Sequence, residues 1–79
     1  MTRRTFCEKD GISITYLDDN VAFEEVGTAE SILFANDGTV LFNNFAADAE
    51  RTQFFKDYFH RIYPYVVQMR ELDALETVA

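Results

Sequence analysis

The hydrophobic period of this chain changes near residue 45. Before that point, apolar and polar residues alternate in short runs separated by turn residues, which is the pattern of half-buried β-strands. After it, apolar residues recur at intervals of three and four, which is the period of an amphipathic α-helix. The sequence therefore predicts an α+β protein in which a C-terminal amphipathic helix covers one face of a small antiparallel sheet of four or five strands.

The first three predicted strands occupy the N-terminal third of the chain. Residues 3–8 and 12–17 flank a short turn at residues 9–11, whose glycine can adopt a positive φ, so they are expected to pair as a hairpin. A third and weaker strand begins at Val21 and ends near Gly27.

A second hairpin gives the strongest local signal. Residues 31–35 and 39–42 flank Asn36-Asp37-Gly38, and an Asp-Gly pair between two apolar runs is typical of a tight β-turn. Both runs are apolar on both faces, so we expect this hairpin at the centre of the sheet or beneath the helix. The order of the strands in the sheet is left open.

The helical region is predicted to start near Ala46. Its apolar stripe consists of Phe55, Tyr58, Phe59, Ile62 and Val66. Asn43 or Asn44 is expected to cap the helix. Asp48 and Glu50 then lie in the first turns, where negative charge interacts favourably with the helix dipole.

Pro64 interrupts this helical pattern. Proline lacks a backbone donor and its ring clashes with the preceding turn, so we expect the helix to be kinked or broken there. The apolar stripe also changes phase, because a straight helix would bring Asp73 onto the apolar side. A second apolar face is formed by Tyr65, Met69, Leu72 and Leu75.

Length and composition limit the class of protein. A chain of 79 residues forms one domain with a small margin of stability. With 48% hydrophobic residues it is too apolar for a disordered acidic tail, despite a net charge of −7. It has no apolar run long enough for a membrane span, no apolar signal-peptide core, and only one cysteine, Cys7. We expect a soluble, cytoplasmic protein that is stabilised by packing.

The charged residues are segregated along the chain. Residues 10–50 contain nine carboxylates and no Lys or Arg, whereas all seven basic residues lie outside this block. A surface of one sign attracts partners of the opposite sign, and the lack of a basic cluster disfavours nucleic acid as a direct ligand. The residues expected to contact a basic partner are Asp18, Asp19, Glu24, Glu25, Glu30 and Asp37.

Catalytic and metal-binding motifs are not recognisable in the sequence. Cys7 lies on a predicted strand and is interpreted as a small buried hydrophobe, and His60, the only histidine, falls on the polar side of the helix. The pairs Asp18-Asp19 and Glu24-Glu25 do not converge through their own backbone, because neighbours in a strand point to opposite faces. We expect a non-enzymatic protein without a metal or cofactor.

Aromatic residues are concentrated in the predicted helix. They are Phe54, Phe55, Tyr58, Phe59, Tyr63 and Tyr65. Their arc spans about half of the helix circumference, which is more than one small sheet face covers. Four of them either remain exposed as a partner or dimer surface, or are covered when the segment after Pro64 folds back. These four are Phe54, Tyr58, Tyr63 and Tyr65.

The leading hypothesis is an acidic protein-interaction module that docks on a basic, nucleic-acid-binding surface as an inhibitor or decoy. In size and acidity the chain resembles the small inhibitor proteins that phages use against host enzymes, a likeness of general character that carries over no residue. The alternative is a homodimeric structural or assembly module that associates through the aromatic helix face. A third hypothesis is a small-ligand pocket between sheet and helix, lined by Tyr16, Phe23, Phe42 and Tyr58.

Overall fold

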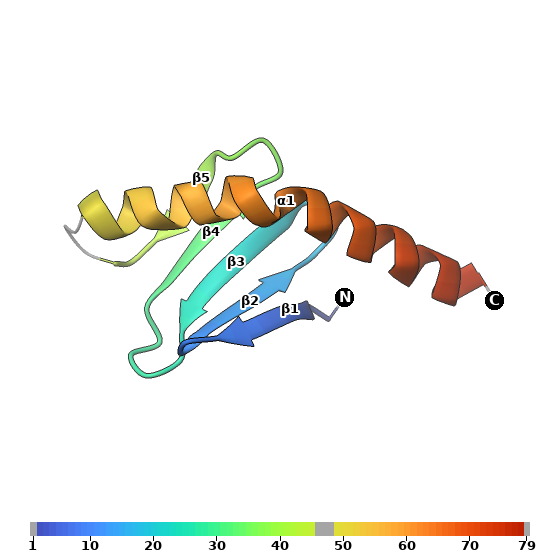
Figure 1. Ribbon diagram of the computed structural model, residues 1–79, viewed down its shortest axis with the longest axis horizontal. Helices are drawn as coiled ribbons and strands as arrows, with labels where there is room; N and C mark the ends of the chain where they lie inside the picture. Colours follow the sequence, from blue (N-terminus) through green and yellow to red (C-terminus); the bar gives the residue numbers. More distant parts are fainter. Residues whose placement is uncertain (1, 46–48, 79) are drawn as a thin grey trace.

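The computed structural model describes residues 2–45 and 49–78, with side chains as far as Glu76. Its elements are β1 (Arg4–Lys9), β2 (Ile12–Tyr16), β3 (Asn20–Glu25), β4 (Ser31–Ala35), β5 (Val40–Asn43) and α1 (Ala49–Val78). The predicted α+β architecture is confirmed (Figure 1). The expected helix start near Ala46 and the first-turn position of Asp48 lie outside the described residues.

The strands form a single antiparallel sheet in the order β1-β2-β3-β4-β5. Asp10 and Gly11 both have positive φ, at 55° and 78°, which gives the first hairpin a two-residue turn that matches the twist of its strands. Gly38, with φ of 93°, closes the β4–β5 hairpin. Because each strand reverses direction, successive turns lie at opposite ends of the sheet.

The second hairpin is not central, because β5 forms one edge of the sheet. Ile32 and Phe34 of β4 are buried beneath the helix, but Leu41 and Phe42 of β5 are 56% and 51% exposed. In the pairing of β4 with β5 the register shifts between Leu33 and Phe34, so that Leu41 is an extra residue in a bulge. The expected burial of both strands is therefore confirmed for β4 and wrong for β5.

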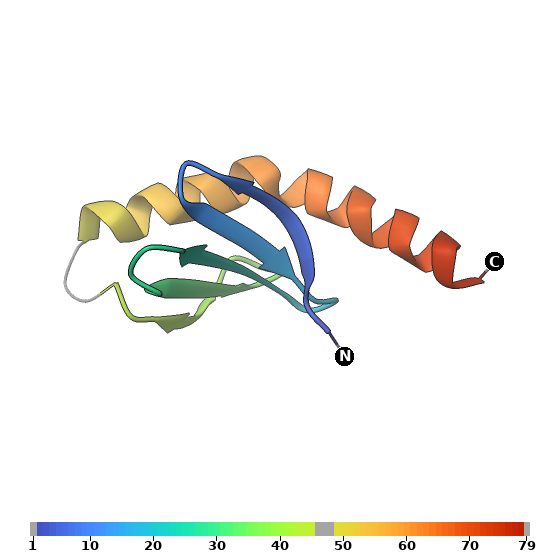
Figure 2. The same cartoon turned by 90° about the horizontal axis from the view of Figure 1, so that it is seen from below.

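One face of the sheet packs against α1 and forms the core. The buried side chains are Ile14, Tyr16, Val21, Phe23, Ile32, Phe34, Phe45, Phe55, Phe59 and Val66. Aromatic rings join the two layers, with ring centroids 4.8 Å apart for Phe34 and Phe59 and 5.5 Å apart for Phe23 and Phe55. Figure 2 shows the helix on one side of the sheet. Among the described residues, no helix lies against the opposite side, the open face.

The helix runs without a break from Ala49 to Val78, through Pro64. The break that the sequence predicted is therefore wrong, and a kink is not shown. Pro64 has no amide hydrogen, so the His60 carbonyl one turn earlier has no donor within the helix. Both residues are exposed, and water can therefore hydrate this carbonyl. The C-terminal part of α1 extends beyond the sheet (Figures 1 and 2), which contributes to overall dimensions of 45 × 25 × 20 Å.

Candidate functional site

The six carboxylates predicted to contact a partner lie at the two opposite ends of the sheet. Glu24, Glu25 and Glu30 are at the end where the β1–β2 turn meets the β3–β4 loop, which are joined by a 2.9 Å hydrogen bond from the Val26 amide to the Gly11 carbonyl. The others, Asp18, Asp19 and Asp37, lie in the β2–β3 and β4–β5 turns at the opposite end. The predicted single acidic surface is thus divided into two groups.

The first group, which we call the acidic end, gathers carboxylates from five segments of the chain. It consists of Glu8, Asp10, Glu24, Glu25, Glu30 and Glu50, with Lys9 and Arg51 as basic neighbours. Glu8 of β1 and Glu24 of β3 both pair with Ser13 of β2. Ser13 alternates with the buried Ile14, so these three side chains lie on the open face. The sequence did not predict Glu8 and Asp10, whose place at this end follows from strand order, or Glu50, whose neighbour Arg51 joins the start of α1 to Glu25.

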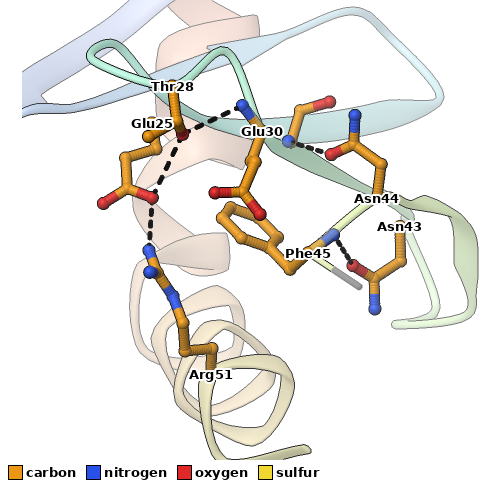
Figure 3. Close-up of polar contacts among 8 residues, drawn as sticks. Glu25, Thr28, Glu30, Asn43, Asn44, Phe45 and Arg51 are labelled. Atoms are coloured by element: carbon orange, nitrogen blue, oxygen red, sulfur yellow. Dashed lines mark hydrogen bonds and ion pairs between the residues drawn. The ribbon is translucent and has the colours of Figure 1, made fainter. Parts of the chain in front are cut away.

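Glu25 and Glu30 lie on the helix side of the acidic end. Arg51 in the first turns of α1 forms a salt bridge with Glu25, with 2.5 Å between Nη2 and Oε2. Figure 3 shows the carboxylates of Glu25 and Glu30 on the same side of the β3–β4 loop. The acidic end therefore continues around the edge of the sheet from the open face to the start of the helix.

Backbone hydrogen bonds fix the loop that carries these acids. The Glu25 carbonyl accepts a 2.8 Å hydrogen bond from the Ala29 amide, and the Glu25 amide donates to the Glu30 carbonyl at 2.8 Å. Ala29 has a φ of 60°, in the left-handed region that favours glycine. The Thr28 hydroxyl donates to Glu25 Oε2 and accepts from the Glu30 amide (Figure 3).

Asn43 and Asn44 hold the segment that leads towards the helix. Both side-chain oxygens accept from amides outside the described helix, so the predicted capping contact is not among those that the structure describes, and the residues just before Ala49 lie outside the described part of the chain. Asn44 Oδ1 accepts a 2.6 Å hydrogen bond from the Ser31 amide, and Asn43 Oδ1 accepts a 3.0 Å hydrogen bond from the Phe45 amide (Figure 3). These bonds position Phe45, whose ring stacks on Phe55 and lies 4.9 Å from the Arg51 guanidinium.

The opposite end of the sheet, which we call the arginine end, contains Asp18, Asp19 and Asp37 together with Arg3 and Arg70. Arg70 donates to the carbonyls of Leu17 and Asn20, at 2.9 and 3.3 Å. The guanidinium charges therefore lie beside the β2–β3 turn that bears Asp18 and Asp19. Their presence gives this end a mixed surface.

Two pKa values at the arginine end reflect this environment. Burial lowers the pKa of the Arg3 guanidinium, and the nearby charge of Asp19 opposes that shift. Hydrogen bonds from the hydroxyl and amide of Thr39 lower the pKa of Asp37. Both observations describe charged groups that are held by contacts within the chain.

An open cleft of about 980 Å³ lies where the helix leaves the sheet. Its lining includes Arg3, Arg4, Tyr16, Met69, Arg70 and Asp73. The Tyr16 hydroxyl donates to Asp73 Oδ2 at 2.5 Å, and Arg4 Nε lies 3.7 Å from the same oxygen. Burial and the hydrogen bond to Asp73 raise the pKa of Tyr16 to about 12. We interpret these contacts as the joint that holds the second half of α1 on the sheet.

The four residues predicted to line a small-ligand pocket do not surround a common space. Tyr16, Phe23 and Tyr58 belong to the core or pack against it. Phe42 pairs with Leu33, which alternates with the buried Ile32 and Phe34, so Phe42 faces the open side of the sheet. The prediction of a pocket at these residues is therefore wrong.

The residues considered for catalysis or metal binding lie apart. Cys7 is half-buried against the core, and His60 is exposed on the helix next to Gly38. Among the residues that the structure describes, no group of three His, Cys, Asp or Glu side chains is arranged to hold a metal ion.

The aromatic residues of the helix are divided between core and surface. Tyr58 and Tyr63 pack partly against the core, whereas Phe54 and Tyr65 are 48% and 58% exposed. Because α1 is continuous, its second half does not fold back over these residues. Leu72 and Leu75 are also exposed, at 54% and 69%. In the sequence, the exposure of Tyr65, Leu72 and Leu75 was indicated by the shift of the apolar stripe to another side of the helix after Pro64.

Comparison with known proteins gives no match to a family, to a curated protein or to a solved structure. In the described part of the chain, no helix has both the length and the apolar content that crossing a bilayer requires.

Proposed function

We propose that this chain is a small acidic, non-enzymatic interaction module that binds a protein with a basic surface through its acidic end. The observation that carries the proposal is the convergence of carboxylates from β1, the β1–β2 turn, β3, the β3–β4 loop and the start of α1. The other end of the sheet is a weaker candidate, because Arg3 and Arg70 accompany its carboxylates.

The electrostatics of the acidic end favour a basic partner. Its carboxylates repel one another in the free protein, and a partner that brings Lys or Arg side chains relieves this repulsion on binding. Complementary charge also speeds the encounter and makes it sensitive to salt. The fixed β3–β4 loop holds Glu25 and Glu30 in place before the partner arrives.

The proposed partner surface is one that ordinarily holds nucleic acid, because such surfaces present clustered Lys and Arg side chains. A protein that occupied it with carboxylates would compete with the phosphates. On this proposal the chain acts as an inhibitor or decoy of a nucleic-acid-binding protein.

Two matched triple variants test the proposal. The first, Asp10→Asn, Glu24→Gln and Glu30→Gln, removes three charges from the acidic end. The second, Asp18→Asn, Asp19→Asn and Asp37→Asn, removes the same number from the arginine end. Proteins retained from a cell lysate by the immobilised wild-type chain at low ionic strength are identified, and their dissociation constants are then measured for all three chains.

The expected result is retention of a basic, nucleic-acid-binding protein whose affinity falls with added salt and with the first triple variant, and much less with the second. Displacement of nucleic acid from that protein by the wild-type chain is the expected competition result. Affinity that is independent of salt, or an equal loss in both triple variants, would contradict a role for the acidic end. Circular dichroism of the three chains controls for folding.

A further inference from the structure

A second surface, on the side of α1, is independent of the acidic end. Along α1, seven residues follow one another at alternating intervals of four and three, which is the spacing of a coiled-coil seam. We call them the outer stripe; they are Phe54, Tyr58, Arg61, Tyr65, Gln68, Leu72 and Leu75. The stripe extends ~32 Å at the rise of an α-helix.

The large hydrophobic residues of the described helix that are exposed all belong to the outer stripe. Phe54, Tyr65, Leu72 and Leu75 are all among the large exposed hydrophobic residues, with exposures of 48–69%. The C-terminal part of α1 extends beyond the sheet (Figure 1), and no other described element covers Leu72 or Leu75. Several exposed apolar side chains on one side of a helix are typical of an interaction surface.

Part of the stripe is already held in a fixed position. Tyr58 packs edge-on against Phe23 of the core, with ring centroids 5.3 Å apart, and against Phe54, at 5.8 Å. The Arg61 guanidinium lies 5.2 Å from the centre of the Tyr58 ring. Fixed side chains lose less conformational entropy when a partner binds.

The charges beside the stripe indicate what binds there. Its middle carries Arg61, whereas Glu71 and Glu76 flank its C-terminal part. In a parallel pair of identical helices Arg61 would face its own copy, and Glu71 would lie near Glu76 of the other chain. An antiparallel pair instead brings Arg61 close to both acids of the other chain and aligns the two helix dipoles favourably.

We propose that α1 pairs antiparallel with α1 of a second copy of this chain through the outer stripe. Arg61 of each copy lies opposite Leu72 of the other, and Tyr58 lies opposite Leu75 of the other. The projecting half of each helix then packs beside the sheet-bearing half of its partner helix. This dimer uses no residue of the acidic end and does not depend on the function proposed above.

Analytical ultracentrifugation from micromolar to millimolar concentration tests the pairing. We expect the wild-type chain to dimerise, and Leu72→Lys to raise the dimer dissociation constant about 100-fold or more, because it places a second positive charge opposite Arg61 of the other copy. Leu41→Lys is the matched control, since Leu41 is similarly exposed but lies on β5. A wild-type chain that stays monomeric, or a Leu72→Lys chain that dimerises like Leu41→Lys, would overturn the proposal.

Disulfide cross-linking tests the direction of the helices. In chains that also carry Cys7→Ala, Arg61→Cys and Leu72→Cys are made separately and then mixed under oxidising conditions. The antiparallel arrangement predicts a disulfide between the two different chains in the mixture. Efficient cross-linking of each variant with itself and none between them would show a parallel pair and overturn the proposed arrangement. Dimerisation of the acidic-end triple variant, measured alongside, separates this inference from the proposed function.

Discussion

The two halves of α1 are attached to the sheet by different interactions. In the first half, Phe55 and Phe59 are buried against the strands at 1–2% exposure, and Val66 continues this packing just beyond Pro64. In the second half, Arg70 donates to the Leu17 and Asn20 carbonyls, and Asp73 accepts from the Tyr16 hydroxyl. Apolar packing attaches the first half of the helix, and hydrogen bonds contribute strongly to the attachment of the second.

This difference explains why one continuous helix carries two apolar stripes. The stripe of the first half faces the sheet, whereas Tyr65, Leu72 and Leu75 face outward. Asp73 lies on the sheet side, where Tyr16 and Arg4 provide partners for its carboxylate. The sheet-facing side of a helix is therefore not always its apolar side.

The largest expected difference between the two halves of α1 is in how much an alanine substitution lowers the unfolding free energy of the protein. Phe59→Ala should lower it by about 3–5 kcal/mol, because the change removes a buried ring that stacks on Phe34. Leu72→Ala should change the stability of the monomer by less than about 0.5 kcal/mol, because Leu72 is exposed. Urea denaturation at a protein concentration below dimerisation measures both. Similar losses for the two variants would contradict the comparison.

A smaller effect is expected at the hydrogen-bonded joint. Tyr16→Phe keeps the buried ring but removes the hydroxyl that donates to Asp73, and should lower the unfolding free energy by about 1.5–3 kcal/mol near neutral pH. The folded-state pKa of Tyr16 is raised from 10.0 to about 12, so this contribution is complete below about pH 10 and is lost as the pH rises through 12.

Urea denaturation of both chains between pH 7 and pH 12 measures this loss. The stability difference between wild type and Tyr16→Phe should be constant up to about pH 10 and then shrink. A difference that persists unchanged at pH 12 would show that the hydrogen bond to Asp73 is not its source.

The smallest expected effect concerns the junction between the two halves. Pro64→Ala restores the amide that can donate to the His60 carbonyl and should raise the unfolding free energy by about 1–2 kcal/mol. The change removes the cost of proline inside a helix, but it also removes the restriction that proline places on the unfolded chain, which offsets part of the gain. Gln68→Ala, at another exposed helix position, is the control. A loss of stability in Pro64→Ala would mean that the fold depends on the backbone geometry that proline imposes.

Some features followed directly from local sequence patterns. The Asp10-Gly11 and Asn36-Asp37-Gly38 turns were predictable because the β-turns need residues that adopt positive φ. The sheet-facing stripe was predictable because Phe55, Phe59, Ile62 and Val66 share one side of a helix. The continuity of α1 through Pro64 was not predictable from the sequence. The cost of a proline inside a helix depends on whether the carbonyl that loses its donor, here that of His60, reaches water.

The sequence by itself determined the change from strands to helix, the turn positions and the excess of negative charge, because each depends on residues close together in the chain. Tertiary structure decided which carboxylates lie together. The strand order brings Asp10 and Glu30 to one end of the sheet and leaves Asp18, Asp19 and Asp37 beside Arg3 and Arg70 at the other. Electrostatic neighbours are set by distance in space, and strand order fixes that distance.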